Sequence, residues 1–208
     1  QYIIIDGGST DKTLEIVNKY KDKIDIVLSE TDYGLYHAMN KGLELATGDV
    51  IGMINADDYY YPDIFQDVIE SFKDVDLDTN IFFGDMFHNG QTISGWRPKS
   101  LKIGAFGAHP SMFVPQAVYK KIGLYKLHYK ILSDYDFMYR AFNIYNIQPI
   151  YLPKLTAFFN TGGLASRNIF RSYTEEMIIK VDNGEFIYKA FGVYLLKLCK
   201  YTLSLRWR

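Results

Sequence analysis

The sequence predicts an α/β fold with a mainly parallel sheet and helices on both of its faces. Three observations support this prediction. Short apolar stretches alternate with helical stretches, which is typical of parallel sheets. Two apolar stretches end in acidic segments, as strands that lead into a ligand site often do. Finally, 48% of the 208 residues are hydrophobic and 23% are charged, a composition that excludes wholesale disorder.

The first predicted strand is Tyr2–Asp6, an apolar run that ends in an acid. Asp11 is a suitable N-cap for a helix over Lys12–Tyr20. A proline is favoured in the first turn of a helix, so Pro62 is expected to open one. The alternating pattern then predicts, in order, strand Ile24–Ser29, helix Gly34–Ala46, strand Asp49–Ile54, helix Pro62–Phe72 and strand Ile81–Phe83.

Beyond Gly84 the alternation weakens. We expect a strand at Thr92–Trp96, a loop at Gly104–His109, and helices at Pro115–Ile122 and Asp134–Asn143. No internal repeat or low-complexity linker divides the chain. A single domain is therefore expected over residues 1–183, followed by a basic amphipathic helix over residues 184–208.

Charge and cysteine content exclude several classes of protein. The net charge is −1, so the chain as a whole is no polyanion binder and no nucleic-acid partner is expected. Cys199 is the only cysteine, which excludes a disulfide scaffold and a cysteine-cluster metal site and fits a reducing compartment. The chain is rich in aromatic residues, which suit a sugar-binding cleft but mostly serve as core.

The C-terminal segment has a different character, with five Lys or Arg residues and one acid from Glu185 onward. Lys189, Lys197 and Lys200 lie opposite an apolar stripe at helical spacing. The stripe consists of Ile187, Phe191, Tyr194, Leu195, Leu198, Thr202 and Leu205. Two interpretations stay open: a helix on a membrane surface, or a helix packed on the core of its own domain. The apolar run is too short to span a bilayer.

Asp57 and Asp58 follow the predicted strand that ends at Ile54. Two adjacent carboxylates repel each other unless a cation or hydrogen-bond donors lie between them. Mg²⁺ typically takes one or two carboxylates together with substrate phosphates. The pair therefore suits a metal that holds a nucleotide diphosphate, and the alternative is a solvated turn before Pro62.

The segment Asp6–Asp11, with the sequence DGGSTD, combines an acid with two glycines and two hydroxyls. Glycines let a backbone approach a ligand closely, and the acid can accept hydrogen bonds from a base or a ribose. The alternative is a tight turn between a strand and a helix that Asp11 caps. Neither the dinucleotide-binding glycine pattern nor the P-loop lysine is present.

Several short motifs follow one another in a specific order. They are Asp6–Asp11 (DGGSTD), Glu30–Gly34 (ETDYG), Ala38–Gly42 (AMNKG), Ala46–Gly48 (ATG), Asn55–Asp58 (NADD), His109–Phe113 (HPSMF), Ser133–Asp136 (SDYD) with Arg140, and Gly162-Gly163. Each motif is unspecific alone. The ordered set resembles family 2 glycosyltransferases of the GT-A fold, over roughly Tyr2–Ser166.

The resemblance implies roles for the matching acids. Asp6 matches the acid that hydrogen-bonds the nucleotide base, and Asp32 matches a second acid near the base. Asp57 and Asp58 stand at the family's Asp-x-Asp motif, where they would hold the ribose and the divalent metal, Mn²⁺ or Mg²⁺, with its diphosphate. Asn55 replaces the first acid of that motif, so the adjacent pair must suffice.

Asp134 matches the family's catalytic base. In an inverting transfer, such a base removes the proton of the acceptor hydroxyl while the nucleotide diphosphate leaves. The alternative role of Asp134 is an N-cap on the following helix, which Ser133 could share. His109, before Pro110, either faces the acceptor or is a hydrogen-bonded structural histidine. Gly162 and Gly163 either belong to a loop that closes over the diphosphate or form an ordinary turn.

The leading hypothesis is a metal-dependent inverting glycosyltransferase that acts on a nucleotide-diphosphate sugar and a glycan or lipid-linked acceptor. Its expected place is the cytoplasm, with peripheral contact at the inner face of a membrane through the C-terminal helix. Two alternatives are a catalytically silent binding module on the same fold and a phosphohydrolase or nucleotidyltransferase. The family begins with one further strand and helix before the segment matching Tyr2–Asp6, so we expect residues upstream of Gln1.

Overall fold

The computed structural model describes residues 1–96, 109–160 and 167–206. The first half contains β1 (Ile3–Asp6), α1 (Thr13–Lys19), β2 (Ile26–Ser29), α2 (Leu35–Leu45), β3 (Val50–Gly52), β4 (Tyr59–Tyr60), α3 (Ile64–Phe72), β5 (Asn80–His88) and β6 (Gln91–Ile93). The second half contains β7 (Met112–Pro115), α4 (Gln116–Ile122), α5 (Ser133–Asn143), β8 (Gln148–Phe158), α7 (Ile169–Asp182) and α8 (Ile187–Arg206). Short 3₁₀ turns lie at Lys21–Lys23 and His109–Ser111.

The strands form two sheets. β1 and β2 are a parallel pair in which Asp6 lies opposite Ser29. The larger sheet has the strand order β3-β7-β5-β8-β4, with β6 also paired to β5. β5 and β8 are parallel, whereas the other pairs of this sheet are antiparallel. The predicted α/β fold class is confirmed. The β1–β2 sheet is parallel, whereas the larger sheet is mixed, with β5–β8 as its parallel pair.

Helices cover both faces of the larger sheet, as predicted. Phe82 and Phe83 are adjacent in β5 and both are fully buried. Because successive side chains of a strand point to opposite faces, Phe82 packs in the cluster with Ile64 and Val68 of α3. Phe83 packs on the other side, in the larger cluster with Phe137 of α5.

The helices predicted before Asn143 are present with small shifts of their ends. The strand predicted at Ile81–Phe83 is longer and passes through Gly84, where the sequence suggested an end. A Cβ at Gly84 would lie 1.7 Å from the side chain of Thr156 in β8, so glycine is what lets the two strands approach. Residues 104–108 of the predicted loop lie outside the described residues.

β5 turns back into β6 at Asn89 and Gly90, which both have positive φ angles. An Asn-Gly pair in this conformation is typical of two-residue hairpins. The strand predicted at Thr92–Trp96 is observed as β6, at Gln91–Ile93.

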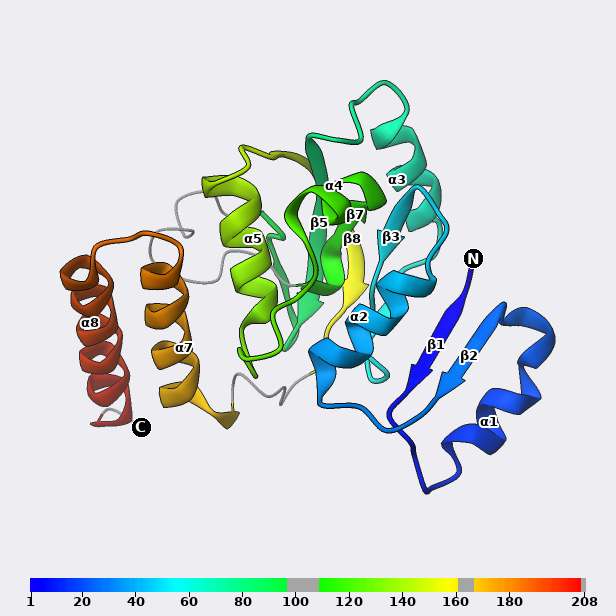
Figure 1. Ribbon diagram of the computed structural model, residues 1–208, viewed down its shortest axis with the longest axis horizontal. Helices are drawn as coiled ribbons and strands as arrows, with labels where there is room; N and C mark the ends of the chain where they lie inside the picture. The colour runs from blue at the N-terminus through cyan, green and yellow to red at the C-terminus, as the bar shows by residue number, and fades with distance from the viewer. Residues whose placement is uncertain (97–108, 161–166, 207–208) are drawn as a thin grey trace.

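α7 and α8 lie side by side at one end of the molecule, far from the β1–β2 pair (Figure 1). α8 meets α7 through a face that includes Ala190 and Lys197, and Lys197 bonds to Glu176 of α7. Lys197, which was predicted to lie opposite the apolar stripe, therefore faces α7. Ile187 and Phe191 of the predicted stripe are exposed instead of packed on the core. Within the described residues, no helix has the length and hydrophobicity needed to cross a membrane.

Candidate active site

Asp6 ends β1 and its side chain is buried. Its Oδ2 accepts hydrogen bonds from the backbone N–H groups of Gly8 (3.1 Å) and Ser9 (3.0 Å) and from the hydroxyl of Ser29 (2.6 Å), while Oδ1 accepts from the Ser9 hydroxyl. The hydroxyls of Ser29 and Ser9 are the main reason that the pKa of Asp6 falls to about 2. Asp6 is therefore a stable anion that organises the Gly7–Ser9 turn.

Asp32 follows β2, the parallel neighbour of β1, and its Oδ1 accepts a hydrogen bond from the Gly34 N–H at 2.7 Å. The Gly7 turn presses against this side chain, since a Cβ on Gly7 would lie 2.5 Å from Oδ2 of Asp32. The fold therefore brings Asp32 against the turn that Asp6 organises. Both acids predicted to bind the nucleotide lie at one edge of the β1–β2 sheet, where parallel sheets bind ligands.

Asp57 and Asp58 precede β4, which pairs antiparallel with the end of β8. This pairing brings Asn160, just past β8, against both acids. The Asn160 backbone N–H donates to Oδ1 of Asp58 at 2.8 Å, and its side-chain amide lies 3.5 Å from Oδ2 of Asp57. The amide of Asn55 donates to Oδ2 of Asp58 at 3.0 Å. The residue that replaces the first acid of the motif therefore orients the last one.

The two carboxylates differ in their surroundings. Asp57 is exposed, whereas Asp58 is partly buried, and this burial raises the pKa of the Asp58 carboxyl despite the bonds from Asn160 and Asn55. A nearby cation would favour the charged form of such a carboxyl. Within the described residues no group of three His, Cys, Asp or Glu side chains could hold a metal. The pair fits Mg²⁺ or Mn²⁺ that takes its other ligands from a diphosphate and water.

Asp134 lies in the first turn of α5 and is partly buried. Its Oδ1 accepts hydrogen bonds from the Tyr36 hydroxyl at 2.9 Å and from the Tyr135 N–H at 2.8 Å. Among the described residues, Oδ2 of Asp134 has no hydrogen-bond partner. One oxygen is thus held by two donors, while the other has no donor among the described residues.

The contacts of α5 differ from those expected of a simple helix cap. Leu132 occupies the N-cap position, and no side chain caps it by a hydrogen bond. The hydroxyl of Ser133 donates instead to the carbonyl of Lys126 at 2.9 Å. Neither Asp134 nor Ser133, the two predicted caps, therefore occupies the N-cap position and makes the side-chain bond that defines it.

His109 is buried, and its Nε2 lies 2.9 Å from the Tyr125 hydroxyl. Within the part of the chain that the structure describes, its Nδ1 has no hydrogen-bond partner. Burial lowers the pKa of His109, and the charges of Asp134 and Asp58 act against this effect. Its contact with Tyr125 supports the structural interpretation, and contact with an acceptor stays a prediction.

A profile described as glycosyl transferase family 2 matches residues 1–157. The chain belongs to this family. The chain is 28% identical over 184 residues to a PGL/p-HBAD biosynthesis glycosyltransferase of Mycobacterium bovis, covering 85% of this chain and 72% of that protein. It is 35% identical over 80 residues to an uncharacterized glycosyltransferase, YibD, of Escherichia coli, covering 38% of this chain and 23% of YibD.

Solved structures show the same fold. The structure of residues 1–349 of TarS from S. aureus in complex with UDP superposes with a TM-score of 0.66 at 18% identity, covering 92% of this chain and 59% of that one. A complex of the same TarS piece with UDP-GlcNAc gives a TM-score of 0.62 at 16% identity, covering 92% and 60%. The chain spans 36% of the longer TarS structure. The predicted glycosyltransferase enzyme of the GT-A fold is confirmed.

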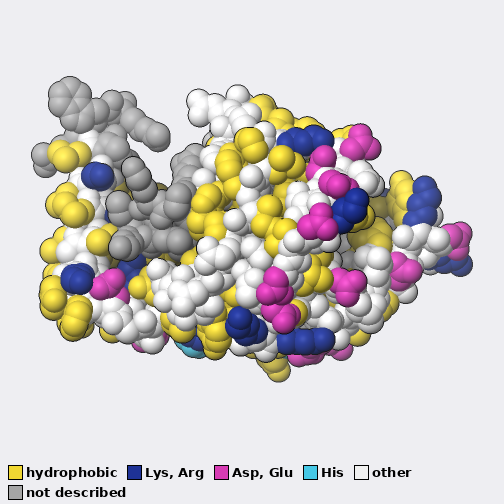
Figure 2. All heavy atoms as spheres, turned by 90° about the horizontal axis from the view of Figure 1, so that it is seen from above, with side chains coloured by type: hydrophobic (Ala, Val, Ile, Leu, Met, Phe, Trp, Pro, Cys, Tyr) yellow, Lys and Arg dark blue, Asp and Glu magenta, His cyan; other side chains and the backbone are white. Residues whose placement is uncertain are grey.

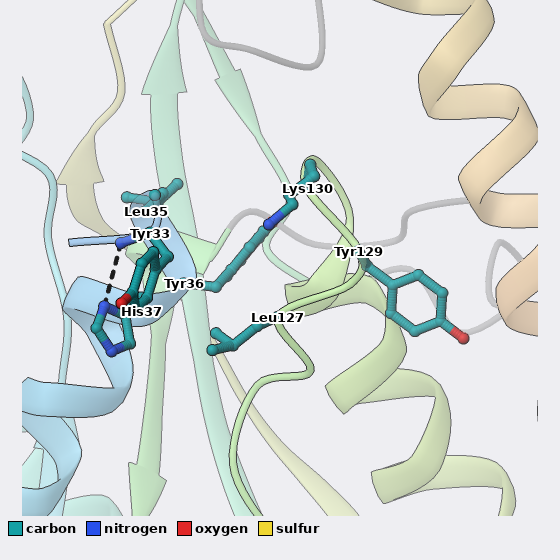
Figure 3. A pocket seen from close by; sticks show the side chains of 8 residues that line it. Tyr33, Leu35, Tyr36, His37, Leu127, Tyr129 and Lys130 are labelled. Carbon is teal, nitrogen blue, oxygen red and sulfur yellow. Dashed lines mark hydrogen bonds between the residues drawn. The ribbon is translucent and has the colours of Figure 1, made fainter.

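A hollow of this family 2 glycosyltransferase lies beside Tyr36, between the start of α2 and the loop before α5. Figure 3 shows Tyr33 and His37 joined by a hydrogen bond on the α2 side, with Leu127 facing them from the loop. A second hollow, of about 400 Å³, is lined by residues that include Leu43 and Gln116, and none of its lining residues is a predicted site residue. Gly162 and Gly163 lie outside the described residues of the glycosyltransferase.

Sequence reasoning missed three residues of this site: Tyr36, Asn160 and Glu175. The sequence gives no sign that the Tyr36 hydroxyl has a functional contact, because Tyr36 looks like an ordinary aromatic residue of an amphipathic helix. Asn160 lies two residues before the Gly162-Gly163 motif, and this position was the available signal. Glu175, on α7, contacts the backbone just before Asp134. No sequence pattern predicts a contact between residues so far apart in the chain.

Proposed function

We propose that this chain is an inverting glycosyltransferase that moves a sugar from a nucleotide-diphosphate donor to a glycan or lipid-linked acceptor, in the cytoplasm, during synthesis of a bacterial cell-surface polysaccharide. The observation that carries the proposal is the state of Asp134. Tyr36 holds one carboxylate oxygen, and the second has no partner among the described residues. A carboxylate held at one oxygen and open at the other suits general-base chemistry.

In the proposed reaction, Oδ2 of Asp134 accepts the proton of the acceptor hydroxyl. The acceptor oxygen forms a bond to the anomeric carbon while the bond between that carbon and the diphosphate oxygen breaks. The nucleotide diphosphate leaves with the electron pair, and one displacement inverts the anomeric configuration. The transition state carries oxocarbenium character, as at other glycosidic centres.

Asp6 and Asp32 would bind the nucleoside, because they share the edge of the β1–β2 sheet. Uridine is the proposed base, since TarS, which shares the fold, binds UDP and UDP-GlcNAc. Asp57 would contact the ribose, and Asp57 and Asp58 would hold the divalent metal with the diphosphate. A bound metal supplies positive charge that stabilises the leaving diphosphate.

Calorimetric titration of UDP, and then GDP, tests the donor side. We expect UDP to bind in the presence of Mn²⁺ and to bind much more weakly without it. Asp58→Ala should abolish the metal-dependent binding of UDP, because the substitution removes the more buried of the two carboxylates. Glu70→Gln is a matched control on the exposed surface of α3 and should bind as the wild type does. Absence of metal-dependent binding of either nucleotide would favour the silent binding module.

The basic C-terminal segment supports a peripheral membrane contact, which we propose for residues 184–208. The face of α8 that points away from α7 exposes apolar side chains over 44% to 68% of their surface. These residues are Ile187, Tyr188, Phe191, Leu195, Leu196 and Leu203. They lie along the outer edge of the molecule, with basic side chains among them (Figure 2). The excess of positive charge favours an anionic lipid surface over a second copy of the same basic helix.

Vesicle co-sedimentation tests this contact. We expect the chain to bind vesicles that contain phosphatidylglycerol and to bind pure phosphatidylcholine vesicles at least tenfold more weakly. The double variant Leu195→Glu/Leu196→Glu should lose the binding. Phe65→Glu/Ile69→Glu is the matched control, because both of its residues are exposed apolar side chains on α3. Equal binding by both double variants, or self-association of the wild type without vesicle binding, would exclude the proposed contact.

A further inference from the structure

Three consecutive backbone N–H groups converge on one carboxylate just before α5. Lys130 donates to Oε1 of Glu175 at 3.1 Å, while Ile131 and Leu132 donate to Oε2 at 2.8 and 3.1 Å. Successive N–H groups that point at one anion form a nest, and hydrogen bonds to a charged acceptor are the strong kind. Glu175 is buried on α7 and thus fixes the path of the chain two residues before Asp134.

The same stretch is held from α2 as well. The hydroxyl of Tyr36 lies 2.7 Å from the carbonyl of Ile131 and 2.9 Å from Oδ1 of Asp134. Burial, followed by the charge of Asp134, raises the pKa of Tyr36 far above its usual range, so the hydroxyl stays protonated. The N–H of Ile131 therefore donates to Glu175, and its C=O shares the single hydroxyl proton of Tyr36 with Oδ1 of Asp134.

We propose that Glu175 and Tyr36 are positioning residues for Asp134. Glu175 acts through the backbone, by fixing where α5 begins. Tyr36 acts both on that backbone and on the carboxylate, where it holds Oδ1 and leaves Oδ2 free for the proton. The proposal rests on the proposed function, in which Asp134 is the base. A displacement of about 1 Å at a reacting group can cost about 100-fold in rate, so this device affects the chemical step more than donor binding.

Glu176 provides a matched control on the same helix. It is as buried as Glu175, but it pairs with Lys180 at 2.7 Å and with Lys197 of α8. None of its contacts among the described residues reaches the Lys130–Leu132 backbone. Glu176→Gln therefore removes the same charge at the same depth without releasing the loop.

The experiment compares Glu175→Gln, Tyr36→Phe and Glu176→Gln with the wild type. Hydrogen exchange of the amides of Lys130, Ile131 and Leu132 reports on the nest without requiring activity. We expect faster exchange in Glu175→Gln and unchanged exchange in Glu176→Gln. UDP release from a panel of UDP-sugars, with UDP-GlcNAc first, gives kcat and KM. We expect kcat to fall about 10- to 100-fold in Glu175→Gln and Tyr36→Phe, with the KM for the donor within about twofold.

A further expectation is that the two substitutions are not additive, because both release the same peptide. If Glu175→Gln does not fold, Tyr36→Phe carries the kinetic test alone. Unchanged kcat in a folded variant with a released loop would overturn the positioning role. An equal fall of kcat in Glu176→Gln would also overturn it, since general destabilisation would then be the cause. A wild type that shows no metal-dependent binding of UDP or GDP would overturn the proposed function itself, and with it this role.

Discussion

Asp134→Asn is expected to lower kcat for sugar transfer by about 100- to 10,000-fold, the usual contribution of a general base. Asparagine has nearly the same shape as aspartate, and its amide oxygen can still accept from the Tyr36 hydroxyl and the Tyr135 N–H. The local structure should therefore persist. What is lost is a group able to accept the proton of the acceptor hydroxyl.

Donor binding separates the two interpretations of Asp134. A base acts on the acceptor, so UDP should bind Asp134→Asn with the affinity of the wild type, as measured by calorimetry. The matched control is Asp182→Asn. Asp182 also accepts a hydrogen bond from a tyrosine hydroxyl, that of Tyr129 at 2.6 Å, but it lies on α7. If Asp134→Asn transfers sugar at the wild-type rate, Asp134 is not the base and its role is structural. That result would support the silent binding module.

The first part of the fold could be predicted from the sequence because its signals are local. Helices such as Leu35–Leu45 follow from apolar residues at helical spacing, and strands such as Ile3–Asp6 follow from short apolar runs. β8 could not be predicted in this way. It contains Pro149 and Pro153, which usually argue against an internal strand, yet it lies between β5 and β4. Long-range pairing with β5, through Gly84, overrides the local signal.

The residues of the candidate site also fall into those that local sequence motifs predict and those that depend on long-range contacts. Asp6, Asp32, Asp57, Asp58 and Asp134 belong to motifs whose order can be read along the chain. Their partners cannot be read in this way. Asn160 reaches Asp58 only because β4 pairs with β8, and Glu175 reaches Ile131 only because α7 packs beside α5. Contacts between residues far apart in sequence require the tertiary structure, so the residues that orient the acids were missed.

α8 shows a different limit. Helical periodicity identified an apolar stripe but could not say which face meets a neighbour, because α8 has apolar residues around most of its circumference. Lys197 turns toward α7, where Glu176 supplies a partner and the ring of Tyr173 lies 5.5 Å from its Nζ. A buried acid on the neighbouring helix is thus enough to bring a lysine into the interface.

Asp136→Asn is expected to lower the free energy of unfolding by about 3 to 5 kcal/mol, the cost of breaking a buried ion pair by removing one partner. Asp136 is fully buried, and its Oδ2 accepts from the Arg140 guanidinium at 2.8 Å. Its Oδ1 accepts from Lys126 at 3.1 Å and from the amide of Asn183 at 3.0 Å. Without the carboxylate, the buried guanidinium of Arg140 has no opposite charge among these contacts.

The loss should extend beyond α5, because Arg140 also donates to the carbonyls of Ile122 and Leu124 at the start of the loop that leads to Asp134. Urea denaturation measures the effect as a lower midpoint with an unchanged slope. Glu70→Gln is the control, since Glu70 and Lys73 form an exposed pair worth at most about 1 kcal/mol. A loss below about 1 kcal/mol in Asp136→Asn would contradict the expectation, and it would mean that neutral hydrogen bonds suffice to hold Arg140 and the loop.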